Sequence, residues 1–187
     1  MTKVIWKPGT MLYPVPAVMV SCGDKPENYN IITVAWTGTI CSEPPMAYIS
    51  VRPTRHSHDL ISQTGEFVIN LASKKLVFAV DYCGVKSGKD INKFKKLKLT
   101  PLKAEHVSAP LIAESPVNIE CRVTERKHLG SHDMFIAKVL CVHADQHYIN
   151  KKGAFNFQAA EPICYSHGKY YLLGRELGHF GFSVKKK

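Results

Sequence analysis

The chain has 187 residues, of which 45% are hydrophobic and 21% charged, and its formal net charge is +10 at pH 7. This length and composition are typical of one globular domain, so we expect a single domain over residues 1–187 rather than a disordered or fibrous protein. No apolar run reaches the roughly 20 residues of a membrane-spanning helix, and we find no secretory signal pattern at the N-terminus.

Short β-branched runs predict strands through the first half of the chain. The first covers residues 15–21, and the second covers residues 31–36, where the chain enters a loop rich in threonine and glycine. Further strands are expected over residues 46–51 and 67–71. β-Branched and aromatic residues favour these assignments because they pack well on a pleated surface.

Short helices are expected between these strands. Two of them start at a serine that can cap the helix and end at a glycine, one from Ser57 to Gly65 and one from Ser73 to Gly84. A further helical turn is expected over residues 90–95.

The second half of the chain is rich in strand patterns. Residues 117–128 alternate between apolar and polar side chains, which indicates a strand with one buried face. After a turn at Gly130, residues 135–142 alternate again, so the two segments predict a long antiparallel hairpin. One face of its second strand carries Phe135, Ala137, Val139 and Cys141. With a last hairpin over residues 163–173, the pattern predicts a mainly β fold, a β-barrel with short helices packed outside.

The segment ISVRPTRHSHDL, residues 49–60, holds the clearest site pattern. Arg52 and Arg55 follow an apolar strand, and guanidinium groups bind phosphate oxygens through paired hydrogen bonds. His56 and Ser57 come next, where a helix start would point free N–H groups at the same anion. The chain has no Walker loop and no GxGxxG motif, so a nucleotide in a P-loop or Rossmann site is not expected. Solvated arginines on a surface loop are the alternative.

Three other segments place polar groups at strand ends or in loops. Asn70 is an amide near the end of an apolar strand and needs a partner if it is buried. The flexible run Ser87-Gly88-Lys89 can close over an anion, or it is a solvated basic loop. His132 follows a glycine turn and can be presented into a cleft, although a histidine at a turn is usually an ordinary surface residue.

In their order and spacing, the blocks NIITVAWTG, PPMAYISVRPTRHSHDLI, GEFVINLA, SGKD with NKF, and GSHDMFIAKV resemble the flavin reductase-like family. This is the FMN-binding split-barrel group that includes flavoredoxins. The resemblance implies a Greek-key split β-barrel that forms homodimers and binds FMN near the subunit interface. Ala137 departs from relatives that often carry glycine there, and the chain after about residue 146 carries no motif that we can assign.

The resemblance also implies which residues bind FMN. The strand end over residues 33–37 would meet the pyrimidine edge and the phosphoribityl chain, residues 50–52 the isoalloxazine ring, and residues 55–57 the phosphate. His132 is the candidate catalytic residue, placed near the flavin or the incoming nicotinamide. The implied cofactor-binding set is Asn30, Thr33, Val34, Ala35, Trp36, Thr37, Ser50, Val51, Arg52, Arg55, His56, Ser57, Asn70, Leu71, Ser87, Gly88 and Lys89.

The implied function is that of an FMN-dependent oxidoreductase of the flavin reductase or flavoredoxin type. It would pass electrons from NADH or NADPH through FMN to a flavin, metal or protein acceptor, and the basic surface would suit an acidic redox partner protein. One alternative is a non-catalytic flavin-binding protein. Another is a basic nucleic-acid-binding β-barrel, although the lysines are not interleaved with aromatic residues that stack on bases.

Neither the histidines nor the cysteines predict a metal site. Spacing of four residues suits ligands on a helix face, but the histidine pairs fall in segments that read as strand or turn. The pairs with this spacing are His128 with His132 and His143 with His147, while His56 and His58 form an HxH pair. The six cysteines are scattered without a CxxC pair, which favours reduced thiols in a cytoplasmic protein.

Overall fold

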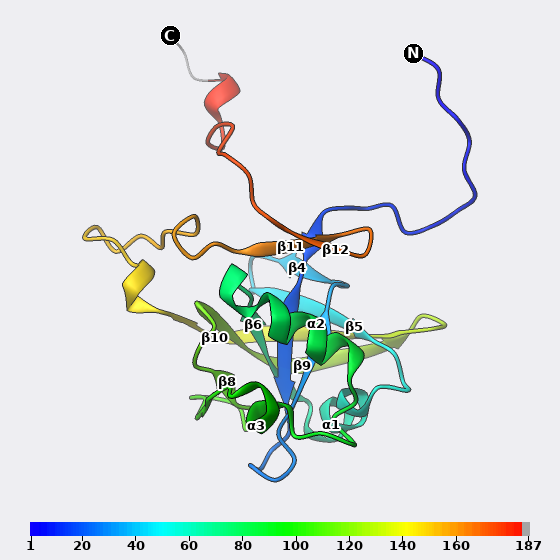
Figure 1. Ribbon diagram of the computed structural model, residues 1–187, viewed down its shortest axis with the longest axis vertical. Coiled ribbons are helices and arrows are strands. Elements are labelled where there is room, and N and C mark those ends of the chain that lie inside the picture. Colours follow the sequence, from blue (N-terminus) through cyan, green and yellow to red (C-terminus); the bar gives the residue numbers. More distant parts are fainter. Residues whose placement is uncertain (185–187) are drawn as a thin grey trace.

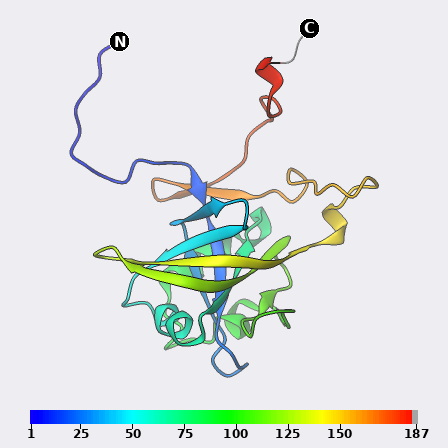
Figure 2. The same cartoon turned by 180° about the vertical axis from the view of Figure 1, so that it is seen from behind.

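The computed structural model describes residues 1–184, and the three terminal lysines, which add to the basic charge, lie outside the described residues. Figure 1 shows a curled sheet with short helices around it, and both ends of the chain extend away from the same side of this body. Seen from behind in Figure 2, a long hairpin formed by β9 (Val117–His128) and β10 (Asp133–Ala144) crosses the face of the sheet.

Seven antiparallel strands form the main sheet, in the spatial order β3-β2-β6-β9-β10-β5-β4. The remaining members are β2 (Val18–Cys22), β3 (Asn30–Val34), β4 (Thr37–Cys41), β5 (Met46–Val51) and β6 (Glu66–Leu71). The two edge strands, β3 and β4, are joined by Ala35 and Trp36 alone. A link this short requires the two edges to lie close together, so the sheet curls into an incompletely closed barrel. The backbone N–H of Ser50 donates to the carbonyl of Trp36 at 2.8 Å near this closure.

The other elements are short. A three-stranded sheet contains β1 (Val15–Pro16), β11 (Ile163–Ser166) and β12 (Lys169–Leu172), and a two-stranded one contains β7 (Pro101–Leu102) and β8 (Leu111–Ile112). The helices are α1 (His56–Thr64), α2 (Val77–Val85) and α3 (Lys93–Leu97), with 3₁₀ turns at Lys74–Leu76, Gln146–Tyr148 and Phe182–Val184. Within residues 1–184, no helix has both the length and the apolar character needed to cross a membrane.

Two apolar layers cover opposite faces of β2 and β3. Val20 belongs to the layer inside the curled sheet, where Ile61 of α1 joins it. Met19 and Ile31 belong to the layer under α2 and α3, where Val80 packs against them. Because both faces of these strands are covered, their sequences read as continuous apolar runs rather than as an alternating pattern.

Two strand predictions were wrong in their bounds. The expected strand over residues 15–21 is split into β1 and β2, and the expected loop after Trp36 is the edge strand β4. Its Gly38 pairs with Tyr48 of β5, and a Cβ at position 38 would lie 3.2 Å from the Tyr48 ring. The glycine therefore makes room for a cross-strand aromatic ring, a use that cannot be told from a turn in the sequence.

The helix termini also differ from the predictions. Ser57 lies inside α1, which Arg55 precedes without a side-chain cap, and the Ser57 hydroxyl instead accepts a hydrogen bond from Asn30 Nδ2 at 2.8 Å. Gly84 does not end its helix, since α2 continues through Val85. A Cβ at position 84 would lie 3.4 Å from Thr33, so this glycine lets α2 approach β3 closely.

Two more helix expectations hold only in part. Ser73 precedes a 3₁₀ turn and makes no capping hydrogen bond. The turn expected over residues 90–95 is displaced to α3, where the Asn92 side chain accepts from the backbone N–H of Lys95.

The predicted hairpin is confirmed, and β9 has the bounds that its alternation indicated, but two details were wrong. The first part of the polar face of β9 is also buried, with Asn118 at 7% and Glu120 at 0% exposure, whereas Arg122 and Thr124 are exposed. A register shift in β10 leaves Val139 opposite Cys121 and Cys141 opposite Glu120. Since Cys121 and Glu120 face opposite sides of the sheet, Cys141 is not on the face of Val139.

Candidate functional site

Three adjoining cavities form a groove along β3. The basic cavity, of about 70 Å³, is lined by Asn30, Ile32, Thr54, Arg55, His56, Ser57, Cys83, Lys86, Ser87, Gly88 and Lys93. It shares Ile32 and Arg55 with the slot, a cavity of about 140 Å³. At its other side it shares Asn30, His56 and Gly88 with the outer cleft, of about 220 Å³.

The basic cavity concentrates positive charge. Arg55, Lys86 and Lys93 line it, and no acidic residue of the described chain lies among its lining residues. Lys93 is 2% exposed, and its Nζ donates to the carbonyls of Ile31 at 2.6 Å and Cys83 at 3.0 Å. Burial lowers the pKa of Lys93, with a smaller contribution from the Arg55 charge, because removing an ammonium from water disfavours its charged form. An anion bound here would offset that cost.

The two thiols near this cavity do not cancel its charge. Burial raises the pKa of Cys83 to about 11 and that of Cys22 to about 12, although Lys93 acts in the opposite direction on both. Both groups are therefore neutral at pH 7, and neither is an activated nucleophile. The cavity keeps a net positive charge.

Local structure explains why these residues meet. The backbone N–H of Arg55 donates to the Arg52 carbonyl at 3.0 Å, and this turn brings the start of α1 to the cavity. The loop that carries Gly88 closes over the start of β3, where a Cβ at position 88 would lie 2.1 Å from Asn30 Oδ1. A larger residue at position 88 would therefore require the loop or the Asn30 side chain to move. A short polar cradle results, with a helix N-terminus on one side and a backbone loop on the other.

The slot lies beside the basic cavity at the junction of the two sheet edges. Its lining residues are Ile32, Thr33, Val34, Ala35, Trp36, Ser50, Val51, Arg52, Arg55 and His132. Burial and, secondarily, the charge of Arg52 lower the pKa of His132. His132 is therefore a neutral imidazole at pH 7, which can donate one hydrogen bond and accept another, and the Ser131 hydroxyl lies 2.9 Å from its Nδ1.

The structure gathers most of the predicted site residues in this groove, divided between its three parts. Arg52 lines the slot and not the basic cavity, so the two arginines do not converge on one anion there. The slot also holds Thr33, Val34, Ala35, Trp36, Ser50, Val51 and His132. The basic cavity holds Asn30, Arg55, His56, Ser57, Ser87 and Gly88, and Lys89 lines the outer cleft.

Three predicted residues do not line the groove. Asn70 is completely buried, where its Nδ2 donates to Ser21 Oγ at 2.9 Å and its Oδ1 accepts from the backbone N–H of Ile112 at 3.0 Å. All its hydrogen-bonding capacity serves the core, as a buried amide requires. Leu71 packs against the interior apolar layer, and Thr37 donates its hydroxyl to the Tyr48 carbonyl at 2.6 Å.

Lys93 is the main lining residue absent from the predicted set. In the sequence it stands in a lysine-rich run, where nothing separates it from solvated neighbours such as Lys95. Its place on α3 turns it inward while Lys95 and Lys96 stay exposed. Lys86 also lines the basic cavity but is itself exposed, and in the sequence it is one of several loop lysines.

Comparison with known proteins agrees with this architecture. The model of the flavin reductase like domain matches residues 10–174. An uncharacterised protein of Archaeoglobus fulgidus is 33% identical over 136 residues, which are 72% of this chain and 75% of that protein. The structure of the flavoredoxin of Desulfovibrio vulgaris (Miyazaki F) is 31% identical, with a TM-score of 0.90 over 99% of this chain and 100% of that one.

A flavoredoxin from Methanosarcina acetivorans is 22% identical and shows the same fold, with a TM-score of 0.89 over 99% of this chain and 100% of that one. The expected mainly β split-barrel fold is thereby confirmed, in agreement with the curled sheet whose two edges meet at Ala35 and Trp36.

Proposed function

The chain belongs to the flavin reductase-like domain family, and from this premise we propose that it is an FMN-binding oxidoreductase of the flavin reductase or flavoredoxin type. It passes electrons from NADH or NADPH through FMN to a flavin, metal or protein acceptor. We also propose that residues 1–187 form a single flavin reductase-like domain.

The observation that carries the proposal is the pairing of the basic cavity with the slot through Arg55. FMN has a phosphate dianion at one end and a flat ring at the other, joined by a flexible ribityl chain. The basic cavity offers Arg55, Lys93 and the start of α1 to the dianion. The slot offers backbone and side-chain donors beside Trp36 to the ring. The residues present therefore fit FMN.

When bound, FMN would supply the hydride and electron chemistry, and the protein would supply binding, orientation and electrostatics. Arg52 places a fixed positive charge in the slot, where it stabilises negative charge that develops nearby. His132, held neutral, can donate a hydrogen bond there without adding a second charge. Val51 and Ile32 exclude water from the slot wall, which strengthens both interactions.

Exposed lysines near the outer cleft favour a protein as the electron acceptor. The exposed Lys89 lines the outer cleft beside Glu27 and Asp90. The exposed Lys95 and Lys96 of α3 follow it in the chain, and an acidic redox partner would be attracted to these lysines. The six cysteines are free, and a cytoplasmic location, where thiols stay reduced, is part of the same proposal.

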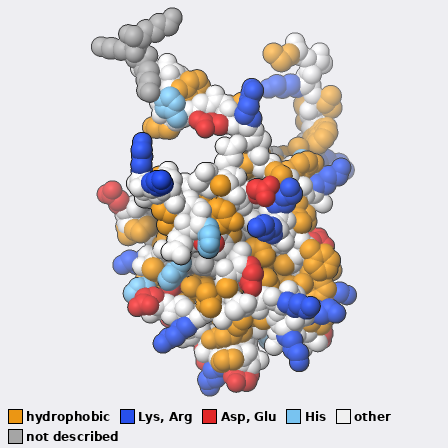
Figure 3. All heavy atoms as spheres, turned by 60° about the vertical axis from the view of Figure 1, so that its left-hand side comes forward, with side chains coloured by type: hydrophobic (Ala, Val, Ile, Leu, Met, Phe, Trp, Pro, Cys, Tyr) orange, Lys and Arg blue, Asp and Glu red, His pale blue; other side chains and the backbone are white. Residues whose placement is uncertain are grey.

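Homodimer formation is also proposed, and the two chain ends support it. Both ends extend from the body and carry exposed apolar side chains, as Figure 3 shows. Ile5 is 98% exposed, Leu177 is 91% exposed, and Phe180 is fully exposed. Apolar side chains presented on extended arms gain free energy when a second copy covers them.

The donor is tested by adding NADH and, separately, NADPH to the FMN-loaded protein without oxygen. We expect one of them to bleach the visible flavin absorption within seconds, while dithionite serves as a positive control for reducible flavin. A flavin that dithionite bleaches but neither nicotinamide reduces would instead favour a non-catalytic flavin-binding protein.

A further inference from the structure

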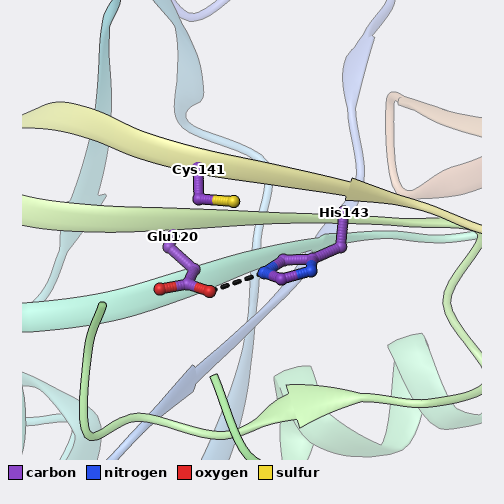
Figure 4. A group of neighbouring side chains, drawn as sticks. All are labelled: Glu120, Cys141 and His143. Atoms are coloured by element: carbon purple, nitrogen blue, oxygen red, sulfur yellow. Dashed lines mark hydrogen bonds and ion pairs between the residues drawn. The ribbon is translucent and has the colours of Figure 1, made fainter. Parts of the chain in front are cut away.

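A second chemical cluster lies on the hairpin, away from the groove. Glu120 of β9 and Cys141 and His143 of β10 bring a carboxylate oxygen, a thiol sulfur and an imidazole nitrogen within 4.8 Å of one another. Figure 4 shows the three side chains together, with Glu120 hydrogen-bonded to His143. Glu120 is completely buried, whereas the side chain of His143 is 35% exposed, so the cluster is reached from solvent on the histidine side.

The register of the hairpin brings these three residues to one face. Cys141 stands directly opposite Glu120, and His143 stands opposite Asn118, the next residue on the Glu120 face. This alignment exists because Leu140 is the extra residue at the register shift. Without the bulge, Cys141 and His143 would follow Val139 toward the barrel interior. Bulges often re-aim side chains beside functional sites.

Glu120 is held firmly before any ligand arrives. Its Oε1 accepts from the backbone N–H of Glu105 at 2.8 Å, and its Oε2 accepts from that of His106 at 2.6 Å. The contact of Oε1 with His143 Nε2 is 2.5 Å. Ligands of tetrahedral Zn²⁺ at about 2.0–2.3 Å lie roughly 3.3–3.7 Å apart, so small side-chain rotations suffice to admit the ion.

We propose that Glu120, Cys141 and His143 form a divalent metal site for Zn²⁺, with a fourth position open to water. Thiolate, imidazole and carboxylate are the ligands that zinc takes in proteins, and a thiolate disfavours Mg²⁺ and Ca²⁺. Binding would form the Zn–S bond and release the Cys141 thiol proton to solvent. The ion would then link β9 to β10 near the open end of the hairpin, through a carboxylate that also accepts from the backbone N–H of Glu105.

This site is separate from the groove. His132 lies at the turn of the hairpin, and Cys141 lies nine positions further along the chain, or roughly 30 Å at the usual rise of a strand. The histidine spacing alone did not indicate it, because the third ligand comes from the neighbouring strand. Binding of metal here and binding of flavin in the groove can therefore be tested independently.

The experiment titrates the full-length, metal-free protein with Co²⁺, which reports tetrahedral and thiolate coordination in its absorption spectrum. We expect one equivalent to give visible bands together with a near-ultraviolet thiolate-to-cobalt band, and Zn²⁺ to abolish both by displacement. Cys141→Ser should remove the thiolate band, and Cys164→Ser is the matched control that should keep it.

A second variant protects the test against a simple folding defect. His143→Gln should weaken Zn²⁺ binding by more than about tenfold, because even indirect partners of a metal are worth roughly 10–100-fold in affinity. His147→Gln is its control, and far-ultraviolet circular dichroism verifies that each variant is folded. No thiolate band in the wild type, or a band that survives Cys141→Ser, would overturn the proposal.

Discussion

The proposal that the groove binds FMN depends most on Arg55, because this side chain lines both the basic cavity and the slot. Riboflavin lacks the phosphate of FMN and so isolates the contribution of the cavity. Arg55→Ala should weaken FMN binding by about 10–100-fold, or roughly 1.5–3 kcal/mol for a lost charged hydrogen bond, and should change riboflavin binding little. Quenching of flavin fluorescence during titration measures both affinities.

Lys103→Ala is the matched control for this prediction. It also removes one positive charge, from an exposed position that lines none of the three cavities. It should leave both affinities unchanged at physiological ionic strength. If Arg55→Ala weakened FMN and riboflavin equally, the phosphate would not lie in the basic cavity.

A substitution at Gly88 changes the shape of the basic cavity without changing its charge. An alanine Cβ would lie 2.1 Å from Asn30 Oδ1, so either the loop or the Asn30 side chain must move. Overpacking of this kind costs about 1–3 kcal/mol, and we expect Gly88→Ala to weaken FMN binding by about tenfold or more. Gly174→Ala, with no atom within 4 Å of its added Cβ, is the control. Isothermal calorimetry measures the affinity for FMN. If Gly88→Ala bound FMN as tightly as the wild type and Gly174→Ala do, the loop at Gly88 would not take part in binding FMN.

Individual residues were predictable from sequence where neighbours in the chain are also neighbours in space. Arg55, His56 and Ser57 follow one another at a strand-to-helix turn, so their convergence was visible. The inward place of Lys93 depends on how α3 packs, and the core role of Asn70 depends on partners such as Ser21 and Ile112. Both depend on contacts between distant segments, which the local pattern does not contain.

Asp133 ties helix α1 to the long hairpin. Its carboxylate lies 2.8 Å from His58 of α1 and 2.8 Å from His128 of β9, and its side chain is 9% exposed. Hydrogen bonds, that to His128 first and that to His58 second, lower its pKa below the usual 3.8. Asp133→Asn should lower the free energy of unfolding at pH 7 by roughly 1–3 kcal/mol, as urea denaturation would measure.

The sign of the pH dependence follows from this lowered pKa. The carboxylate stabilises the fold at every pH above its ordinary value, and that contribution disappears as the pH falls through the lower folded-state value. Stability should therefore fall less steeply below about pH 4 in Asp133→Asn than in the wild type. Asp90→Asn, at an exposed carboxylate away from His58 and His128, is the control. If the free energy of unfolding fell equally steeply with decreasing pH in the wild type and in Asp133→Asn, the Asp133 carboxylate would not be the stabilising group.

Strands and helices were predictable to different degrees. The alternation over Val117–His128 gave the bounds of β9, because a half-buried strand imposes that period. The strand β4 and the end of α2 were missed for one reason, namely that Gly38 and Gly84 resemble turn residues. Each glycine instead makes room for a neighbour, the Tyr48 ring and Thr33 respectively. The bulge at Leu140 leaves no local signature either.

The two extended ends are the feature of the molecule that a single chain leaves unexplained (Figures 1 and 3). If they are arms that wrap a second copy, light scattering after size-exclusion chromatography should give twice the mass of one chain. Leu177→Asp combined with Phe180→Asp should shift the protein toward one copy, since charges replace the apolar side chains that the second copy covers. A wild type with the mass of one chain at micromolar concentration would contradict the dimer.

The split-barrel fold was accessible from sequence because the five segments that resemble the family all lie on the barrel or its groove. NIITVAWTG spans β3 and its link to β4, and GSHDMFIAKV covers the hairpin turn and the first part of β10. The chain after about residue 146 carried no site motif, but the hairpin expected over residues 163–173 is confirmed as β11 and β12. Much of the remaining segment is extended chain with few buried residues, where packing places little constraint on sequence.

The most direct test of the central claim is the visible absorption spectrum of the purified full-length protein after addition of FMN and removal of unbound flavin on a desalting column. We expect a retained flavin spectrum with one FMN per chain, and its loss in Arg55→Ala. A folded protein that emerges without flavin after exposure to saturating FMN would contradict the claim.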